Sequence, residues 1–161
     1  MSFERAIEFV LSHEGELADH PADRGKRTRW GVSSKAHPEV DLDTLTRDGA
    51  IALYRRDYWA RIRGDALPWP LGLVLLDHAV HSGAPRAVRT LQGILGVQQD
   101  GVIGRQTLQA LAGAVLPVVV AECLRERADA LVQQGFARGQ RVFLFGWVSR
   151  LLDLALEAGR G

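Results

Sequence analysis

Apolar and polar residues alternate along the first segment of the chain with the period of an α-helix. Phe3, Ile7 and Val10 recur at steps of four and three residues, so they lie on one stripe of a predicted helix over residues 2–13. The next step of four residues reaches Glu14, which places a carboxyl group on the stripe that the helix would bury. An apolar surrounding favours the protonated form of a carboxyl group, and a general acid needs such a stored proton. Glu14 is therefore the first candidate catalytic residue.

The next segment contains residues that favour turns: Gly15, Pro21, Gly25 and Gly31. Their spacing separates two short segments and predicts a β-hairpin with polar turns. A hairpin that faces the end of the first helix would form a cleft with it. Asp23 follows Glu14 by nine residues, and Thr28 follows Asp23 by five. The cleft would therefore hold a second carboxyl group and a hydroxyl group.

The rest of the pattern is helical and predicts a mainly α fold. The predicted helices run from Thr46 toward Trp59, from Leu71 to Ser82, from Pro85 to Gly96, through a short segment that ends at Leu111, from Val118 to Gln134 and from Phe143 to Ala158. The segment from Leu71 to Ser82 is apolar on nearly all sides, which is typical of a central buried helix. A soft boundary falls near residues 83–85, but the central helix would pack on both parts. We therefore expect one continuous body.

The composition limits the classes of function. A chain of 161 residues, of which 47% are hydrophobic, can form one domain with a sizeable core. The net charge of +1 does not indicate a nucleic-acid partner. Four basic residues lie in or near the predicted hairpin: Arg24, Lys26, Arg27 and Arg29. They could bind an anionic polymer, or they could simply be solvent-exposed side chains of the hairpin.

The single cysteine and the hydrophobic runs also exclude some features. Cys123 is the only cysteine, so no intramolecular disulfide can form, and its helical surroundings favour a buried packing role. The N-terminus lacks the basic start and apolar run of a signal peptide. The apolar run over residues 114–121 is too short to cross a bilayer. We therefore expect neither a signal peptide nor a membrane span.

Several sequence blocks together carry a family resemblance. In chain order they are His13-Glu14-Gly15, Pro21-Ala22-Asp23 with Gly25, Thr28-Arg29-Trp30-Gly31-Val32-Ser33, Tyr54-Arg55-Arg56-Asp57-Tyr58-Trp59 and Leu76-Asp77-His78-Ala79-Val80-His81-Ser82-Gly83. They resemble the motifs of glycoside hydrolase family 108, the phage and prophage muramidases that cut peptidoglycan. A further block, from Leu95 to Leu108, resembles a motif common in peptidoglycan-binding modules.

The resemblance implies a fold, a reaction and a division of the chain. The fold would be lysozyme-like, mainly α, with a small β-hairpin at the catalytic cleft. Residues 1–84 would form the catalytic muramidase region, and residues 85–161 a helical peptidoglycan-binding region packed on it. The reaction would be hydrolysis of the β-1,4 bond between N-acetylmuramic acid and N-acetylglucosamine. By resemblance to phage-type lysozymes, we expect inversion at the anomeric carbon.

The chain departs from the family motifs at four positions. Glu16 replaces the second glycine after the catalytic glutamate, and His20 replaces the aspartate before the loop proline. Lys26 replaces the second glycine of a pair, and His81 replaces the asparagine of an Asn-Ser-Gly block. The three catalytic candidates are kept, so we expect the same reaction class. Subsite preference and pH optimum can differ.

Each catalytic candidate also has an ordinary structural explanation. Glu14 would donate a proton to the glycosidic oxygen, but a glutamate at a helix end can also be a surface residue. Asp23 would stabilise the oxocarbenium-like centre or orient a water molecule, although aspartate favours turns as well. Thr28 could position water with its hydroxyl group, or it could merely favour a strand.

Aromatic and polar residues outside this group are candidates for binding the substrate. Trp30, Tyr58 and Trp59 could offer aromatic faces to sugar rings, although aromatic side chains more often pack in cores. Asp100 and Thr107 could contact a stem peptide, and a turn and a helix cap explain the same residues equally well.

Three polar residues interrupt the predicted central helix. Asp77, His78 and His81 suit a hydrogen-bond network or the back wall of the cleft better than a metal site. His81 is therefore a further substrate-binding candidate. We expect no metal and no other cofactor.

The expected partner is the glycan strand of peptidoglycan, and we expect a monomer that binds no nucleic acid. The protein would be made in the bacterial cytoplasm without a signal peptide. It would then act on periplasmic peptidoglycan as an endolysin, after release by a route such as a phage holin. Two alternatives remain open. A lytic transglycosylase also uses one glutamate but leaves an anhydro-sugar, and a cell-wall-binding protein or secretion factor can keep the fold without catalysis.

Overall fold

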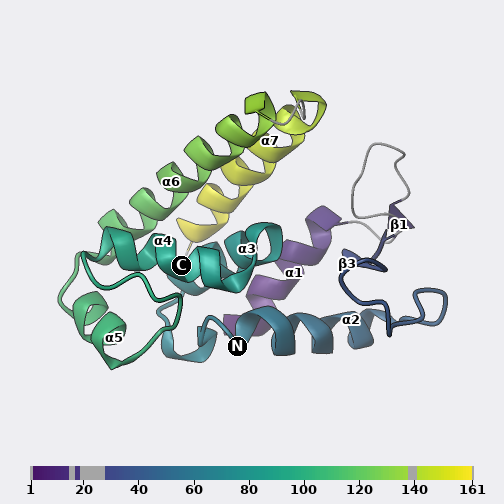
Figure 1. Ribbon diagram of the computed structural model, residues 1–161, viewed down its shortest axis with the longest axis horizontal. Coiled ribbons are helices and arrows are strands. Elements are labelled where there is room, and N and C mark those ends of the chain that lie inside the picture. Colours follow the sequence, from purple (N-terminus) through teal and green to yellow (C-terminus); the bar gives the residue numbers. More distant parts are fainter. Residues whose placement is uncertain (1, 15–16, 19–27, 138–140, 161) are drawn as a thin grey trace.

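The chain folds into helices that surround α3 (Leu71–Ser82). The structure is a computed structural model and describes residues 2–14, 17–18, 28–137 and 141–160 (Figure 1). The other helices are α1 (Ser2–Glu14), α2 (Arg47–Tyr54) with a π-helical turn after it (Arg55–Trp59), a 3₁₀ turn (Gly64–Ala66), α4 (Ala84–Ile94), α5 (Arg105–Ala112), α6 (Leu116–Ala137) and α7 (Arg141–Ala158). Helices α1, α4, α6 and α7 all pack against α3.

The helices predicted from the sequence are confirmed, and the local reasons can be seen. The central helix has the predicted bounds, and all residues from Leu71 to Ala79 are buried. The side chain of Thr46 accepts a hydrogen bond from the backbone nitrogen of Gly49 at 3.1 Å, which makes it the N-cap of α2. Pro85 lies in the first turn of α4, where a missing N–H group is tolerated.

Helices α6 and α7 form an antiparallel hairpin, and its far end extends beyond the rest of the helices (Figure 1). A Cβ atom on Gly135 would lie 2.5 Å from a methyl carbon of Leu144, so the glycine allows the two helices to approach closely. The C-terminal half of α7 runs beside α1. There Arg5 donates to Glu157 at 2.9 Å, and His13 lies 3.1 Å from Asp153.

The predicted hairpin is confirmed and belongs to a three-stranded antiparallel sheet. Its strands are β1 (Leu17–Ala18), β2 (Thr28–Arg29) and β3 (Val32–Ser33), in that order. Trp30 and Gly31 connect β2 to β3 with φ angles of 53° and 73°. Positive φ at both central residues is the requirement of a two-residue type I′ turn. Trp30 therefore has a backbone conformation that is uncommon for a residue other than glycine.

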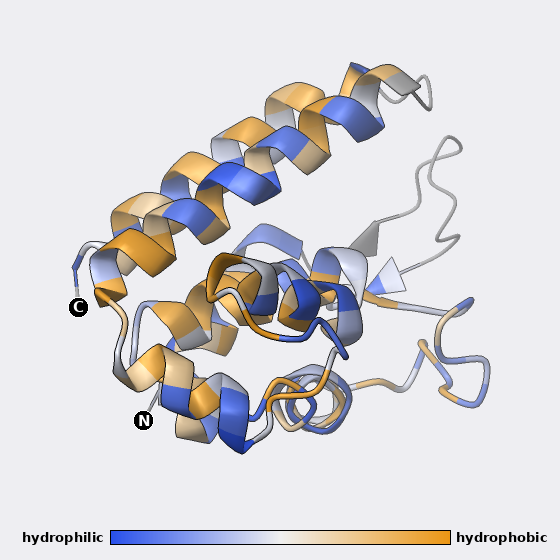
Figure 2. Cartoon of the chain, turned by 60° about the vertical axis from the view of Figure 1, so that its left-hand side comes forward, coloured by the Kyte–Doolittle hydropathy of each residue, from blue (hydrophilic) through white to orange (hydrophobic). Residues whose placement is uncertain are grey.

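The described helices differ in length and in apolar character. No single one of them is both long and apolar enough to cross a bilayer. Helices α5 and α6 reach that length and composition only together, and the chain bends by 117° between them. Hydrophobic and hydrophilic residues lie side by side along α6 and α7 (Figure 2).

Candidate active site

Glu14 is the last residue of α1, and it lies between two cavities. One cavity has a volume of about 330 Å³ and is lined mainly by residues of α6 and α7. The other has a volume of about 370 Å³ and is lined mainly by the β3 region and the α2 segment. Glu14 and His81 line both cavities, so the two form the halves of a groove that meet at these side chains. The Glu14 side chain is 23% exposed, which leaves it accessible from this groove.

An arginine from the other end of the chain holds the Glu14 carboxylate. Arg150 of α7 donates from Nη1 to Oε1 of Glu14 at 2.6 Å, across 136 positions of sequence. The sequence analysis predicted an apolar surrounding for this carboxyl group, and that prediction is wrong. The stripe position did place Glu14 against the neighbouring helices, but the neighbour it contacts there is a cation. A charge-assisted hydrogen bond of this length orients the carboxyl group strongly.

A buried aspartate positions that arginine in turn. Asp77 of α3 has no exposed side-chain surface, and its Oδ1 accepts from Nε of Arg150 at 2.8 Å. Its Oδ2 forms an ion pair with Arg127 of α6, whose side chain is 3% exposed. Burial alone would raise the pKa of Asp77, but Arg127 and Arg150 together hold it below its ordinary value. The carboxylate of Asp77 therefore stays charged and joins three helices beneath Glu14.

The turn between β2 and β3 forms a second support for Glu14. A Cβ atom on Gly31 would lie 2.7 Å from Cγ of Glu14 and 2.2 Å from the hydroxyl oxygen of Tyr54. That hydroxyl donates to the backbone oxygen of Trp30 at 3.2 Å. Burial and then the charge of Glu14 raise the pKa of Tyr54, so the phenol keeps its proton and remains a donor. Only glycine fits at position 31, because its φ is positive and no space is left for a side chain.

Two histidines of α3 lie behind the groove. Burial, followed by the charge of Arg127, lowers the pKa of both His78 and His81 to about 4. Both rings are therefore neutral near neutral pH. The Nε2 atom of His81 is buried and forms no hydrogen bond with any residue that the structure describes. The ring of His81 meets the ring of Trp147 edge-on, with centroids 5.4 Å apart.

These two histidines should make the folded protein less stable as the pH falls. The unfolded chain binds a proton at each histidine below about pH 6.5, whereas the folded chain does so only near pH 4. The free energy of unfolding is therefore unaffected by these histidines above pH 6.5 and decreases as the pH falls toward 4. Each histidine contributes up to about 1.4 kcal/mol per pH unit in this window. His81→Asn should therefore reduce the loss of unfolding free energy between pH 6.5 and pH 5 by about 1 to 2 kcal/mol. Urea unfolding at several pH values measures this, and an unchanged pH dependence in the variant would contradict it.

The other two catalytic candidates are less fully described. Asp23 lies outside the described residues. Thr28 of β2 stands directly opposite Ser33 of β3, and directly opposite residues of an antiparallel pair point to the same face of the sheet. Ser33 lines the 370 Å³ cavity with Glu14, so Thr28 lies one strand away from that cavity on the same face.

Of the three aromatic candidates, one reaches the groove and one lies in the core. Tyr58 lines the 370 Å³ cavity. Trp59 is 1% exposed, packs against Phe3 and donates from its indole nitrogen to Asp65 at 2.8 Å. Its faces are covered, so the structure does not support Trp59 as a sugar platform. Trp59 is the last residue of the π-helical turn and the buried one. Trp30 is half-buried in the tight turn beside the groove.

The two stem-peptide candidates have structural roles. The buried amide of Gln92 donates to Asp100 at 2.7 Å and to Thr107 at 3.3 Å, and it accepts from the backbone of Gly101 at 2.9 Å. These bonds hold the loop between α4 and α5. Thr107 is 3% exposed, so its hydroxyl cannot reach a ligand at the surface. The alternative explanation as turn and packing residues therefore accounts for both positions.

Four side chains that α6 and α7 bring to the groove were not predicted from the sequence: Arg127, Phe143, Trp147 and Arg150. One signal was available. Arg127 falls four residues after Cys123 and four before Leu131, and all three are buried. It therefore interrupts a buried helical stripe with a charge, as Glu14 does in α1.

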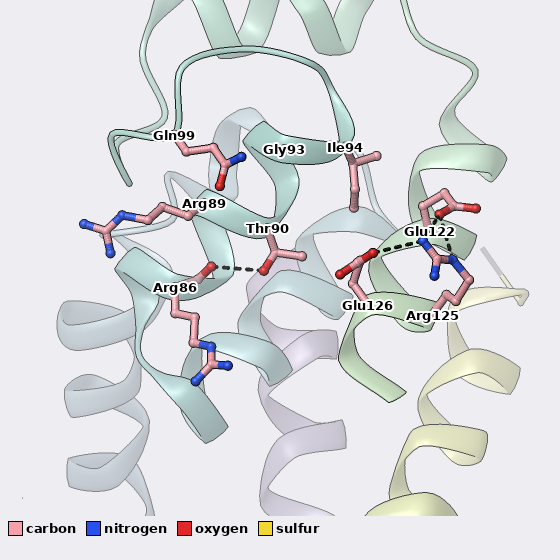
Figure 3. A pocket seen from close by; sticks show the side chains of 9 residues that line it. All are labelled: Arg86, Arg89, Thr90, Gly93, Ile94, Gln99, Glu122, Arg125 and Glu126. Carbon is pink, nitrogen blue, oxygen red and sulfur yellow. Dashed lines mark hydrogen bonds and ion pairs between the residues drawn. The ribbon is translucent and has the colours of Figure 1, made fainter. Parts of the chain in front are cut away.

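A larger cavity of about 700 Å³ lies elsewhere, between α4 and α6 (Figure 3). Its acidic side chains, Glu122 and Glu126, are both paired with Arg125 at 2.8 and 2.9 Å. The hydroxyl of Thr90 donates to a backbone oxygen of its own helix. The side chains of Glu122 and Glu126 are 41% and 46% exposed, against 23% for Glu14, and they lie outside the sequence blocks that resemble the family motifs, so this cavity is not the candidate active site. Within the described part of the chain, no three His, Cys, Asp or Glu side chains cluster as metal ligands would.

Two comparisons with known proteins found a match. The sequence profile described as glycosyl hydrolase 108 matches residues 7–83, which include Glu14 and Asp77. The solved structure of SagA from Brucella abortus is similar with a TM-score of 0.86 and 35% sequence identity, over 97% of this chain and 92% of SagA. No curated protein sequence matches. The similarity to SagA extends through α6 and α7, which complete the groove around Glu14. The chain belongs to glycosyl hydrolase family 108 and is a glycoside hydrolase that acts on peptidoglycan.

Proposed function

We propose that the protein is a muramidase that hydrolyses the β-1,4 bond between N-acetylmuramic acid and N-acetylglucosamine, with Glu14 as the general acid. The observation that carries the proposal is the position of Glu14. Its carboxyl group lies where two cavities meet, and its side chain is 23% exposed. A glycan strand that lies along both halves of the groove would place one glycosidic bond at this carboxyl group.

The hydrogen bond to Arg150 makes the two carboxyl oxygens of Glu14 inequivalent. Oε1 accepts from the guanidinium, and Oε2 forms no hydrogen bond with any described residue. In the protonated acid, Oε2 would carry the proton and donate it to the glycosidic oxygen as the bond to the sugar breaks. Arg150 would then stabilise the carboxylate that this step leaves behind.

The same displacement consumes a water molecule, which attacks the anomeric carbon as the glycosidic bond breaks. Asp23 is the proposed group that activates this water or stabilises the oxocarbenium-like centre, and Thr28 would help to position it. In an inverting glycosidase the two carboxyl groups are far enough apart to leave room for water on the opposite face of the sugar.

Product analysis tests the proposal directly. Purified sacculi digested with the protein should release fragments that carry one water for each new end, as mass spectrometry can measure. Fragments that lack this water would instead identify a lytic transglycosylase. Proton NMR of a defined glycan strand should show the α-anomer first, because inversion of a β-linkage gives an α product. A β product would contradict inversion.

The resemblance to phage and prophage muramidases extends the proposal to the cellular role. The protein would be an endolysin that is made in the cytoplasm and reaches periplasmic peptidoglycan through a holin. This role, the route of release and the monomeric state stay predictions.

A further inference from the structure

We propose that Phe143 and Trp147 of α7 form an aromatic face that binds an N-acetylhexosamine ring on the α7 side of Glu14. The proposal rests on the proposed function, since it assigns a glycan to the groove. It adds a sugar-binding site in the half of the groove that α6 and α7 line.

The two rings stack on each other beside the cavity. They are separated by four residues on α7, so they lie on the same side of the helix. Their planes differ by 24°, and their centroids are 6.0 Å apart. Both side chains are half-buried and line the 330 Å³ cavity beside Glu14. Trp147 is also held from below by the edge-on contact with His81.

The cavity has the mixed character that a sugar requires. A pyranose ring presents C–H groups on its faces, and these pack against the negative face of an aromatic ring. Its edges carry hydroxyl and amide groups, which need donors and acceptors. In this cavity Phe143 and Trp147 supply the aromatic part, and Glu14, Gln134 and Arg150 supply polar groups. Its volume falls within the usual range of about 300–1,000 Å³ for small-molecule sites.

The hairpin holds these rings in place over the groove. Leu144 packs against Gly135, so α7 cannot separate from α6 without losing this close contact. Arg150, one turn further along α7, is tied to Asp77 and Glu14. The aromatic pair and the carboxyl group of Glu14 are therefore linked through α7, which carries both rings and Arg150. Phe145 lies on a different side of α7 and is 84% exposed, which makes it a matched control.

Binding of a β-1,4-linked N-acetylglucosamine oligosaccharide, measured by isothermal titration calorimetry, tests the site. The measurement uses Glu14→Gln protein throughout, so that the sugar is bound and not cut. Trp147→Leu removes the flat ring but keeps an apolar side chain, and it should weaken binding by about five- to tenfold. Trp147→Phe should retain most of the affinity, because it keeps an aromatic face. Phe143→Leu should show a smaller loss, and Phe145→Leu none.

Three outcomes would overturn the proposal. The oligosaccharide could fail to bind the Glu14→Gln protein at all, Trp147→Leu could bind as tightly as its parent, or Phe145→Leu could lose as much as Trp147→Leu. Thermal unfolding of each variant shows whether a loss of affinity reflects a damaged fold. Trp147→Phe shows whether the affinity depends on an aromatic face or on the size of the side chain. The assay counts bound sugar and not cut bonds. If Glu14→Gln still hydrolysed peptidoglycan, the proposed acid would be wrong while the sugar site would stand on its own data.

Discussion

Replacing Glu14 with glutamine should lower the rate of peptidoglycan hydrolysis by about 10²- to 10⁴-fold, the usual contribution of a positioned general acid. Glutamine has nearly the same shape and can still accept a hydrogen bond from Arg150, but it has no acidic proton to donate. Clearing of permeabilised Gram-negative cells, followed as turbidity, measures the rate. Binding to purified sacculi should persist, because the groove itself is unchanged.

A second glutamate of the same helix provides the control. Glu8 of α1 is exposed and pairs with Arg47 at 2.6 Å, away from the groove. Glu8→Gln should clear cells at the parental rate. Asp23→Asn should also reduce clearing, by less than Glu14→Gln, because it alters the water step alone. Parental clearing by Glu14→Gln would show that this carboxyl group is not the acid, and parental clearing by Asp23→Asn would leave that residue as a turn former.

Replacing Asp77 with asparagine should destabilise the fold by about 3–5 kcal/mol, as expected when one partner of a buried ion pair is removed. Asp77 has no exposed side-chain surface, and it neutralises both Arg127 and Arg150. Without it, two guanidinium groups remain close together in a largely water-free region. Urea unfolding followed by circular dichroism measures the change in unfolding free energy. Activity should fall as well, because Asp77 no longer positions the guanidinium group of Arg150 beside Glu14.

Two further variants distinguish buried charge from general damage. Glu122→Gln removes a carboxylate from the exposed pairs of Arg125 on α6, and it should leave stability unchanged, because exposed pairs contribute little. Arg127→Met in the Asp77→Asn background should restore part of the lost stability, since it removes one unpaired buried cation. If Asp77→Asn unfolds within about 1 kcal/mol of the parent, the ion-pair explanation of this network is wrong.

Much of the fold can be predicted from short segments of the sequence. The period of Phe3, Ile7 and Val10 predicts α1 and the inward position of Glu14, and Thr46 begins α2 as the expected cap. The helix from Leu71 to Ser82 was predicted with its bounds because it is apolar on nearly every side. These features depend on hydrogen bonds within a few residues and on which face of an element is apolar, and both are properties of short segments.

The contents of the site depend on contacts that no short segment contains. A buried stripe shows that Glu14, Asp77 and Arg127 turn inward, but it does not show which charge meets which. Arg150 reaches Glu14 across 136 positions only because α7 packs on α1 and α3. In the same way, contacts with Phe3 and Asp65 hold Trp59 in the core, and the α6–α7 hairpin brings Trp147 to the groove. The sequence by itself determined the helices and the inward-facing carboxyl group of Glu14. The tertiary structure decided which residues pair with that carboxyl group. The reason is that pairing between charged side chains depends on the distance between packed helices and not on the spacing of the residues along the chain.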